Sequence, residues 1–390
     1  MSEKEPRKIL YFVTEDWYFW SHRLAIARAA RAAGMEVFVA TNVNAHGEKI
    51  RAEGFHLIPL RLRRRGLNPF LEFFVLVRLF GIYRSVKPDL VHHVAMKPVL
   101  YGSLIAWLQG TPAVVNALTG LGFVFSSATR KAALLRFFVR RALRFLLDRV
   151  NGAAILQNRD DFQALKEFTH LDEARMVLIP GSGVDMNHFT PLTEPEGAPI
   201  TVAMVSRMLL DKGVRELVEA ARLLHRRGSP VRVLLAGTPD PENPTSLSQA
   251  ELEAWNREEP IDWLGFCDDV RTIWQKAHIA ALPSYYGEGI PKSLLEAAAS
   301  ARPIVTTDAP GCREVVLPEK TGLLVPPRNV EALADAIARL AKDPALRLAM
   351  GKEGRAYVEE TFSERLVIER TLGLYRKLLE SRTACAREGG

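Results

Sequence analysis

The sequence predicts an α/β fold made of two doubly wound domains, each a parallel sheet with helices on both faces. Two observations support this prediction. Short β-rich apolar runs alternate with helical stretches in both halves of the chain, an order typical of parallel sheets. The length of 390 residues also exceeds what one hydrophobic core usually serves. Because ligands of such sheets bind beyond the carboxyl ends of the strands, we expect the two domains to face a cleft.

Apolar runs rich in β-branched and aromatic residues mark the expected strands. They cover 8–14, 36–42, 56–60, 89–94, 113–118 and 152–156 in the first half, and 200–208, 231–237, 261–265, 279–284, 303–307 and 322–326 in the second. Helices are expected between them, for example over 21–34, which ends in glycine as a helix C-terminal cap does. A stretch rich in Gly, Pro and Thr, 180–198, resembles a linker, and an amphipathic helix over 363–382 follows the last strand.

Composition indicates an ordinary globular protein of a reducing compartment. Hydrophobic residues make up 48% of the chain and charged residues 25%. Cys267, Cys312 and Cys385 have neither paired nor metal-ligand spacing, so we expect no structural disulfide and no zinc site. The N-terminus lacks the apolar region of a signal peptide. No apolar run reaches the roughly 18 residues of a membrane span. We therefore expect a cytoplasmic protein.

Basic residues are concentrated in one region. The net charge is +7, but residues 55–150 alone hold 15 Lys or Arg against three acids. This region is a candidate surface for an anionic partner. Within it, 61–87 and 129–149 place arginines among Phe, Leu and Val at helical spacing. Such stretches can lie on an anionic membrane with the apolar face down. They can also be core-packing helices with a solvated arginine face, or a nucleic-acid contact.

The segment 279–300, IAALPSYYGEGIPKSLLEAAAS, is expected to form a strand, a loop and a helix from about Pro291. The amides of the first helical turn and the helix dipole form a site for an anion. Glu288 precedes this helix and Glu296 lies in its second turn. Two such carboxylates can accept hydrogen bonds from the hydroxyls of one sugar-containing ligand. On spacing alone we favour the alternative that these glutamates only complement the helix dipole.

A second segment, SRMLLDKG at 206–213, changes that balance. It places Arg207 and Lys212 on a turn between an expected strand and an expected helix. A diphosphate leaving group needs charge-assisted donors of this kind. The alternative is that both are solvated surface cations, as isolated Arg and Lys residues usually are.

With SRMLLDKG and EGIPKSLLE, preceded by GSGVDMNHF and followed by GCREVV and GLLVPP, the chain resembles the retaining glycosyltransferases of family 4. The resemblance implies the GT-B fold, with a Rossmann-like acceptor domain over 1–185, to which a C-terminal helix over 363–390 returns, and a Rossmann-like donor domain over 186–362. It implies that Arg207 and Lys212 bind the donor diphosphate. Glu296 would hold the nucleotide ribose and Glu288 the transferred sugar. The other implied donor contacts are Gly289, Ile290, Lys292 and Ser293 for sugar and phosphate, and Gly265 and Phe266 for the base.

The first half, with TEDWYFWSHRLAIARA, DLVHHVAMKPVLYGSLIA and VNALTGLGFVF, resembles members that extend polyprenyl-diphosphate-linked sugars in bacterial surface glycan synthesis. Glu15, Asp16 and Trp17 stand where common members carry a Gly-Gly loop. Three groups are acceptor-side candidates: Ser21, His22 and Arg23 at an expected helix start; His92, His93 and Lys97 at the carboxyl end of a strand; and Thr119 and Gly120 in a glycine-containing loop. The alternatives are a capped helix with exposed polar residues for the first group and satisfied core histidines for the second.

The resemblance implies transfer of a hexose or N-acetylhexosamine, with retention, from a nucleotide-diphosphate sugar that we expect to be UDP-linked. The expected acceptor is a polyprenyl-diphosphate-linked sugar, which favours peripheral association with the anionic inner face of the cell membrane. No paired aspartates demand a metal, so we expect neither metal nor cofactor. The alternatives are a soluble small-molecule acceptor and a basic nucleic-acid-binding protein, although no nucleic-acid partner is expected. A glycosidase would not need the two cations, and a nicotinamide dehydrogenase would show a Gly-x-Gly-x-x-Gly turn.

Overall fold

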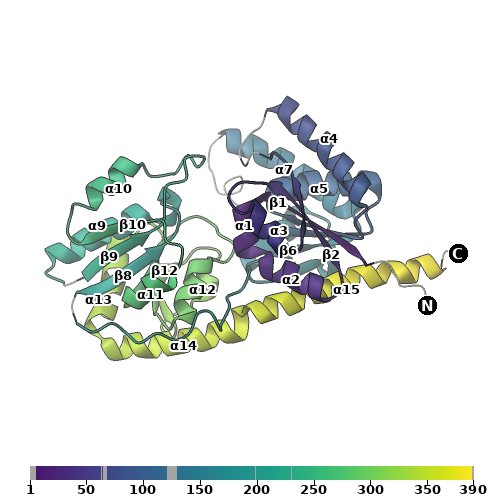
Figure 1. Ribbon diagram of the computed structural model, residues 1–390. Coiled ribbons are helices and arrows are strands. Elements are labelled where there is room, and N and C mark those ends of the chain that lie inside the picture. The colour runs from purple at the N-terminus through teal and green to yellow at the C-terminus, as the bar shows by residue number, and fades with distance from the viewer. Residues whose placement is uncertain are drawn as a thin grey trace. The chain divides into compact units, whose positions relative to one another are not determined.

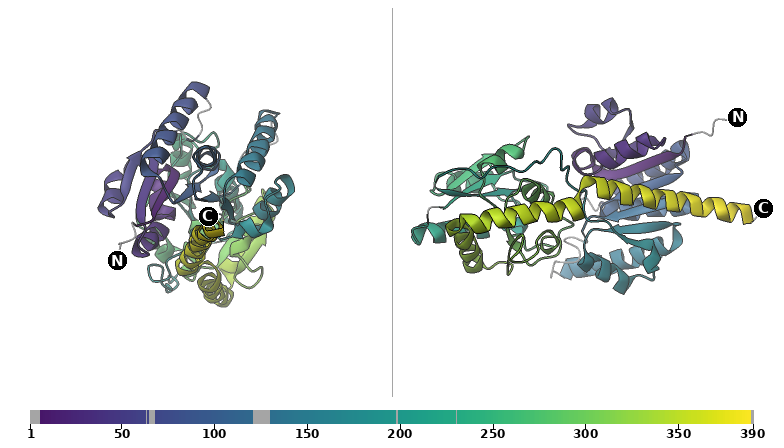
Figure 2. Two further views of the ribbon diagram at one scale, coloured as in Figure 1. Left: turned by 90° about the vertical axis from the view of Figure 1, so that its right-hand side faces the viewer. Right: turned by 90° about the horizontal axis from the view of Figure 1, so that it is seen from below.

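The computed structural model describes residues 6–62, 64, 68–120, 130–197, 199–229 and 231–388 (Figures 1 and 2). It divides into two compact units, Met1–Ser182 with Arg365–Gly390 (unit 1) and Gly183–Glu364 (unit 2). The sequence places the same two divisions after 185 and after 362. Each unit contains one parallel sheet covered by helices, which confirms the predicted fold class.

The sheet of unit 1 is parallel, with the strand order β3-β2-β1-β4-β5-β6-β7. Its strands are β1 Lys8–Glu15, β2 Glu36–Asn42, β3 His56–Pro59, β4 Leu90–Val94, β5 Ala113–Leu118, β6 Gly152–Leu156 and β7 Met176–Leu178. The order reverses between β1 and β4, which makes the carboxyl ends of these two strands the switch point of the unit. The sequence did not predict β7, because a run of three residues is too short to recognise.

The helices of unit 1 pack on both faces of its sheet (Figure 1). They are α1 Asp16–His22, α2 Leu24–Ala32, α3 Gly47–Ala52, α4 Pro69–Val86, α5 Met96–Gln109, α7 Arg130–Arg149, α8 Arg159–Phe168, the 3-10 turn η1 Glu173–Arg175, and the C-terminal α15 Glu364–Glu388. Helix α15 belongs to this unit, as expected, because Val367, Leu374 and Tyr375 pack into its core. Among the described residues, no helix is both long and apolar enough to cross a membrane.

Alternate residues of the central strand β1 build the core of unit 1 on opposite faces of the sheet. Ile9, Tyr11 and Val13 pack on the face that also receives α15. Leu10 and Phe12 pack on the other face, against the carboxyl half of α4. This alternation follows from the two-residue period of a strand, and it shows why the run is apolar at nearly every position.

The sheet of unit 2 has the parallel order β10-β9-β8-β11-β12-β13. Its strands are β8 Ile200–Val205, β9 Val231–Ala236, β10 Ile261–Gly265, β11 Ile279–Leu282, β12 Ile304–Thr307 and β13 Gly322–Val325. Its helices and 3-10 turns are η2 Leu210–Lys212, α9 Val214–Arg226, α10 Gln249–Trp255, α11 Arg271–Lys276, α12 Lys292–Ala299, η3 Arg313–Val315, α13 Val330–Lys342 and α14 Pro344–Phe362. The order reverses between β8 and β11.

The segment that resembles a linker is packed firmly on unit 2 by buried arginines. Arg302 donates hydrogen bonds to the carbonyl oxygens of Leu192 and Thr193, at 3.1 and 2.8 Å. Arg347 binds the carboxylate of Glu194 through Nε and Nη2, at 3.0 and 2.5 Å. The end of this segment therefore belongs to the donor-side unit, and its Pro and Gly content reflects ordered turns.

Replacing Arg302 by Met should destabilise unit 2 by about 3 kcal/mol, because the buried guanidinium is lost and three carbonyl oxygens lose their donor. They are those of Leu192, Thr193 and Trp274. The measurement is urea unfolding followed by circular dichroism. Arg226→Met, at an exposed position that ends α9, is the matched control and should leave the midpoint unchanged. Equal midpoints for both variants would show that Arg302 does not hold the 180–198 segment on unit 2.

Candidate functional site

Unit 2 brings the donor-side candidates together at the point where its strand order reverses. The loop 206–213 leaves β8 and the loop 283–291 leaves β11, and these strands are neighbours in the sheet. Arg207 and Lys212 lie on the first loop, Glu288 lies on the second, and α12 begins where the second loop ends. In doubly wound sheets this is the position where ligands bind.

Hydrogen bonds and a glycine hold the two loops against each other. The hydroxyl of Ser284 and the amide of Tyr285 both donate to the carbonyl oxygen of Asp211, at 3.0 and 3.1 Å. Gly213 has φ of +77°, and a Cβ at this residue would lie 2.1 Å from the carbonyl oxygen of Pro283. Only glycine permits both this backbone conformation and this close approach.

Each of the two predicted phosphate-binding cations faces a carboxylate. Lys212 Nζ lies 2.5 Å from Glu288 Oε2, and their side chains are only 17% and 11% exposed. Arg207 Nη1 lies 2.5 Å from Asp240 Oδ2. Lys212 is therefore not a solvated surface cation. The sequence did not identify Asp240. It follows β9, the neighbour of β8, so its position at the same edge of the sheet was the signal that could have found it.

A tight turn after β12 supports the loop that carries Glu288. The amide of Glu288 donates to the carbonyl oxygen of Pro310 at 3.1 Å. Gly311 has φ of +83°, and a Cβ there would lie 1.9 Å from the carbonyl oxygen of Gly289. The carboxylate of Glu314 fixes this turn by accepting a hydrogen bond from the Gly311 amide at 2.7 Å. The sequence contained this turn as GCREVV but gave no reason to assign it to the site.

Helix α12 presents its first turn at the end of the same loop, with Pro291 as N-cap and Lys292 and Ser293 as the first helical residues. Ile290 is buried in the core, so its backbone rather than its side chain faces the loop. Glu296 is also buried, and burial raises its pKa to about 7, against the opposing effect of the Lys292 ammonium. Lys292 Nζ lies 3.7 Å from Glu296 Oε1. This carboxyl group therefore changes its protonation near neutral pH.

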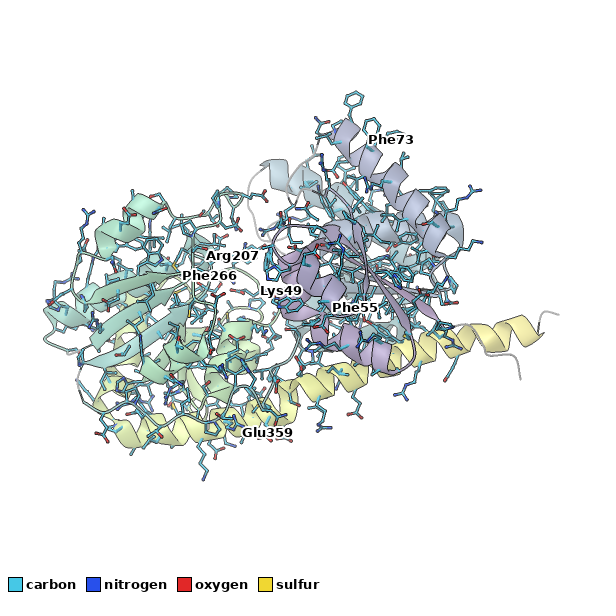
Figure 3. The ribbon with its side chains drawn as sticks, in the orientation of Figure 1. Lys49, Phe55, Phe73, Arg207, Phe266 and Glu359 are labelled. Atoms are coloured by element: carbon cyan, nitrogen blue, oxygen red, sulfur yellow. The ribbon has the colours of Figure 1, made fainter. Side chains whose placement is uncertain are left out.

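Gly265 and Phe266 lie at the carboxyl end of β10. Gly265 has φ of +68°, and its carbonyl oxygen accepts a hydrogen bond from the Gly237 amide at 2.7 Å. The Phe266 side chain is 72% exposed, and Figure 3 shows it in unit 2 together with Arg207. An exposed aromatic ring at a ligand-binding sheet edge can stack on a planar base.

The structure corrects the expectation for the two histidines of β4. Both rings are buried, His92 Nδ1 beside the Tyr375 hydroxyl and His93 Nε2 2.6 Å from the Tyr83 hydroxyl. Burial lowers the pKa of His93 to about 4 and the pKa of His92 well below its usual value, so both are uncharged. They are core residues and not phosphate contacts, because β4 is a central strand covered on both faces.

Lys97 likewise forms an ion pair within unit 1. Its Nζ lies 2.6 Å from Glu72 Oε1, and the hydroxyl of Tyr101 donates to the other oxygen of the same carboxylate at 2.9 Å. This half-buried cluster ties α5 to α4. The expectation that Lys97 contacts an acceptor phosphate is therefore not supported by its position, and its partner indicates an anchoring role.

The first group of acceptor-side candidates lies at the junction of two helices, with Ser21 and His22 at the end of α1 and only Arg23 at a helix start. Helix α1 ends at His22, and Arg23, which is buried, is the N-cap of α2. The hydroxyl of Ser21 donates back to the carbonyl oxygen of Trp17 at 2.8 Å and lies 2.6 Å from His22 Nδ1. The expected single helix over 21–34 is thus wrong, because helix formation begins earlier, at Asp16.

The two acids that replace the family's Gly-Gly loop hold the loop that follows β2. Glu15 Oε2 accepts hydrogen bonds from the side-chain amides of Asn42 and Asn44, at 3.1 and 3.0 Å. Asp16 Oδ2 accepts from the backbone amides of Asn44 and His46, at 2.6 and 2.9 Å. These contacts, which the sequence did not reveal, fix one loop at the carboxyl edge of the unit 1 sheet.

Thr119 and Gly120 follow β5 at that edge and are partly exposed. Gly120 has φ of +108°, a conformation that favours glycine. Residues 121–129, which follow them in the chain, lie outside the described residues. Their contact with an acceptor stays a prediction.

Metal-ligating side chains do not gather in the part of the chain that the structure describes, where no group of three or more His, Cys, Asp or Glu could hold a metal ion. Cys267 and Cys312 are free thiols. Cys312 follows Gly311 in the supporting turn, and burial raises the pKa of its thiol to about 12. The candidate site in unit 2 is built from cations, amides and single carboxylates.

Two family models match the chain. One, described as Glycosyl transferases group 1, matches residues 188–357, and the other, Glycosyl transferase 4-like, matches residues 8–151. A Campylobacter jejuni N,N'-diacetylbacillosaminyl-diphospho-undecaprenol alpha-1,3-N-acetylgalactosaminyltransferase is 29% identical over 92% of this chain and 96% of its own length. An Escherichia coli UDP-Gal:alpha-D-GlcNAc-diphosphoundecaprenol alpha-1,3-galactosyltransferase is 25% identical over 80% of this chain and 81% of its own length.

Solved structures share the fold. Sucrose-phosphate synthase from Thermosynechococcus elongatus superposes with a TM-score of 0.78 at 21% identity, over 96% of this chain and 100% of that one. Anabaena HepE in complex with UDP superposes with a TM-score of 0.76 at 16% identity, over 95% of this chain and 100% of that one. The two family models fall on the two units described above, so the chain is a glycosyltransferase that matches the group 1 and 4-like models and shares its fold with these solved structures.

Proposed function

We propose that this enzyme transfers a hexose or N-acetylhexosamine from a UDP-sugar, bound by unit 2, to a sugar carried on polyprenyl diphosphate. The observation that carries the proposal is the assembly of Arg207, Lys212, Glu288 and the start of α12 at one switch point. Positive groups and helix amides together suit a diphosphate, whereas the carboxylates suit sugar hydroxyls.

The names of the relatives support the substrate classes. The Campylobacter jejuni protein is named for an acceptor on undecaprenyl diphosphate, and the Escherichia coli protein for UDP-Gal and a diphosphoundecaprenol-linked sugar. The Anabaena structure contains UDP. We extend UDP and the lipid-linked acceptor from these proteins to this chain as part of the proposal.

In the proposed reaction the diphosphate leaves with negative charge that Arg207, Lys212 and the first amides of α12 stabilise. Lys212 is shared between Glu288 and the incoming phosphate. Glu288 is then available to accept hydrogen bonds from the transferred sugar. These cations perform the neutralisation for which other enzymes use a metal, so we propose a reaction without metal or cofactor.

Retention of configuration follows if the acceptor attacks the face from which the diphosphate departs. The bond between the anomeric carbon and the phosphate oxygen breaks, the bond to the acceptor oxygen forms, and the departing phosphate takes the acceptor's proton. Glu288 is paired with Lys212 and is proposed to position the sugar, so no covalent glycosyl-enzyme step is needed. Glu296 is proposed to hold the ribose diol and Phe266 to stack on the base.

The acceptor class and the basic region of unit 1 together favour peripheral association with the anionic inner face of the cell membrane. A soluble sugar acceptor is the remaining alternative, and both acceptors belong in the same assay. Transfer to a free sugar, with none to a polyprenyl-diphosphate-linked N-acetylhexosamine, would support that alternative.

Lys212→Ala and Glu288→Gln should each lower the turnover of lipid-linked transfer by roughly 10²- to 10³-fold, because each removes one member of the charge pair at the leaving group. The measurement is UDP release together with product formation from a panel of UDP-sugars. Lys352→Ala, an exposed lysine of α14, is the matched control and should retain full turnover. Near-normal transfer by both site variants, correctly folded, would remove this pair from the reaction.

Gly311→Ala should lower kcat/KM by about tenfold or more, because the new Cβ forces the Gly289 carbonyl, and with it the Glu288 loop, to move. Circular dichroism should show an intact fold. Gly373→Ala is the control, since nothing lies within 4 Å of the position its Cβ would take. Equal kinetic constants for both variants would show that the turn does not position the loop.

The affinity for a UDP-sugar should fall between pH 8 and pH 6, because ribose hydroxyls need the carboxylate form of Glu296, whose pKa is about 7. The loss approaches about tenfold per pH unit below that value. Calorimetric titration with UDP-glucose measures it, since the sugar-linked diphosphate has no group of its own that titrates in this range. Glu296→Gln should bind more weakly at pH 8 and show a flat profile. A flat wild-type profile would refute the ribose assignment.

A further inference from the structure

Exposed apolar side chains in unit 1 are concentrated on two helices. Of the sixteen large hydrophobic side chains that are exposed among the described residues, ten belong to α4 and α7. They are Phe70, Leu71, Phe73, Phe74, Val77 and Phe80 on α4, and Leu134, Phe137, Phe138 and Phe145 on α7. Contiguous exposed apolar patches of this kind usually mark a contact with a partner or a membrane.

The first two turns of α4 place phenylalanines outward and an acid inward. Phe70, Phe73 and Phe74 are 78%, 61% and 67% exposed, and Figure 3 shows Phe73 pointing away from the unit. The residue that faces inward between them is Glu72, whose carboxylate binds Lys97 and the hydroxyl of Tyr101. A surface helix in water normally has the opposite arrangement. The phenylalanines do not dock this part of the helix, because Glu72 holds it through polar bonds and Val75 and Leu76 pack against the core.

The second half of α4 is ordinary. Leu79, Ile82 and Tyr83 are buried in the core of unit 1. The strongest apolar exposure, that of Phe70, Phe73 and Phe74, is therefore at the amino-terminal end, whereas Phe80 in the second half is only 38% exposed. At that end Asn68 caps the helix by accepting a hydrogen bond from the Phe70 amide at 3.1 Å. A capped, anchored helix end with outward phenyl rings is a defined structure and not a frayed one.

Helix α7 adds charge to the same side of the unit. Both α4 and α7 pack against α5, and both begin on the same side of unit 1 (Figures 1 and 2). Residues 130–149 contain seven Lys or Arg and one acid. The guanidinium of Arg149 lies over the Phe145 ring at 3.7 Å, and Arg140 lies over Phe168. Aromatic rings with adjacent arginines suit the boundary between lipid tails and anionic headgroups.

We propose that the first turns of α4 and the exposed face of α7 insert together into an anionic lipid bilayer. The membrane-contact surface consists of Phe70, Phe73, Phe74, Leu134, Phe137 and Phe138, with the α7 arginines at the lipid phosphates. This inference rests on the proposed lipid-linked acceptor. It narrows the sequence expectation, an apolar face on an anionic membrane somewhere within 61–87 and 129–149, to the outward phenyl rings of α4 and the exposed face of α7.

Charge favours a bilayer over a second copy of the chain. A symmetric dimer through this surface would bring two strongly basic α7 helices face to face, and like charges at an interface oppose association. An anionic leaflet supplies the complementary charge and an apolar interior for the rings.

The test is co-sedimentation of the purified full chain with vesicles, either of phosphatidylcholine alone or of phosphatidylcholine with one quarter phosphatidylglycerol. The wild type should bind the anionic vesicles, and salt should weaken this binding. Phe70→Ser/Phe73→Ser/Phe74→Ser and Phe137→Ser/Phe138→Ser should each bind at least tenfold more weakly. Leu348→Ser is the matched control, since Leu348 of α14 is 58% exposed but lies in unit 2, and it should bind like the wild type.

Two measurements keep the outcome unambiguous. A polarity-sensitive fluorophore on Phe73→Cys, in a Cys267→Ser/Cys385→Ser background, should shift to the blue on anionic vesicles. Unshifted emission, or wild-type binding by the triple variant, would overturn the proposal, as would light scattering that shows a wild-type dimer converted to monomer by these substitutions. Vesicle binding without any sugar transfer would instead refute the proposed function alone. The phenylalanine variants should keep full transfer to a short-chain acceptor in detergent.

Discussion

The close approach of two loops at the carboxyl edge of the unit 2 sheet is the constraint on which the candidate site depends. It joins Lys212 and Glu288, which are 76 residues apart in sequence, in one ion pair. Two glycines make the approach possible, Gly213 against Pro283 and Gly311 against Gly289. A Cβ at either position would force the neighbouring backbones apart. The close approach of Lys212 and Glu288 therefore depends on glycine at both positions.

A mostly buried ion pair carries a large desolvation cost and is seldom the most stable solution for a protein interior. The presence of this pair is explained if, when a nucleotide sugar binds, Lys212 contacts the diphosphate and Glu288 contacts the sugar. A diphosphate alone would satisfy Lys212 and Arg207 but would leave Glu288 and Asp240 without their cations. A sugar attached to that diphosphate brings hydroxyl donors for the Glu288 carboxylate. The ion pairs Lys212–Glu288 and Arg207–Asp240 therefore favour a ligand that carries both a diphosphate and a sugar over a diphosphate alone or a sugar alone.

Local patterns predicted most of the fold and the strand ends at which the donor-side candidates lie. Apolar periodicity identified all strands but β7, and short motifs placed Arg207 and Lys212 between a strand and a helix, as the structure has them, because each lies a few residues from the strand that positions it. What the sequence could not provide was the partner of each side chain. Asp240 reaches Arg207 from the neighbouring strand, and the linker docks on an arginine more than 100 residues away.

The errors in unit 1 have the same origin. The order of strands in a sheet cannot be inferred from the sequence of one strand. Nothing in LVHHV therefore showed that β4 is central and that both histidines point into a core. Likewise, an arginine-rich apolar stretch can be read as a helix with its charges outward. The arginines of α4, Arg78 and Arg84, are indeed exposed, but the sequence could not show that Glu72 faces inward, because its partner Lys97 is 25 residues away on a different helix.

The amino-terminal end of α4 also fits what a lipid-linked acceptor requires. A polyprenyl chain is confined to the bilayer, so an enzyme that remains at the surface meets its acceptor far more often than one in solution. The contact must also be reversible. Burial of one phenyl ring is worth about 2 kcal/mol, and each basic residue near an anionic surface adds about 1 kcal/mol. A few phenyl rings and basic residues together give firm but reversible binding. A membrane-spanning helix would prevent the protein from leaving the membrane or rotating out of its plane. Anchoring the helix through Glu72 and Lys97 rather than through its phenylalanines leaves the rings free for lipid without weakening the fold.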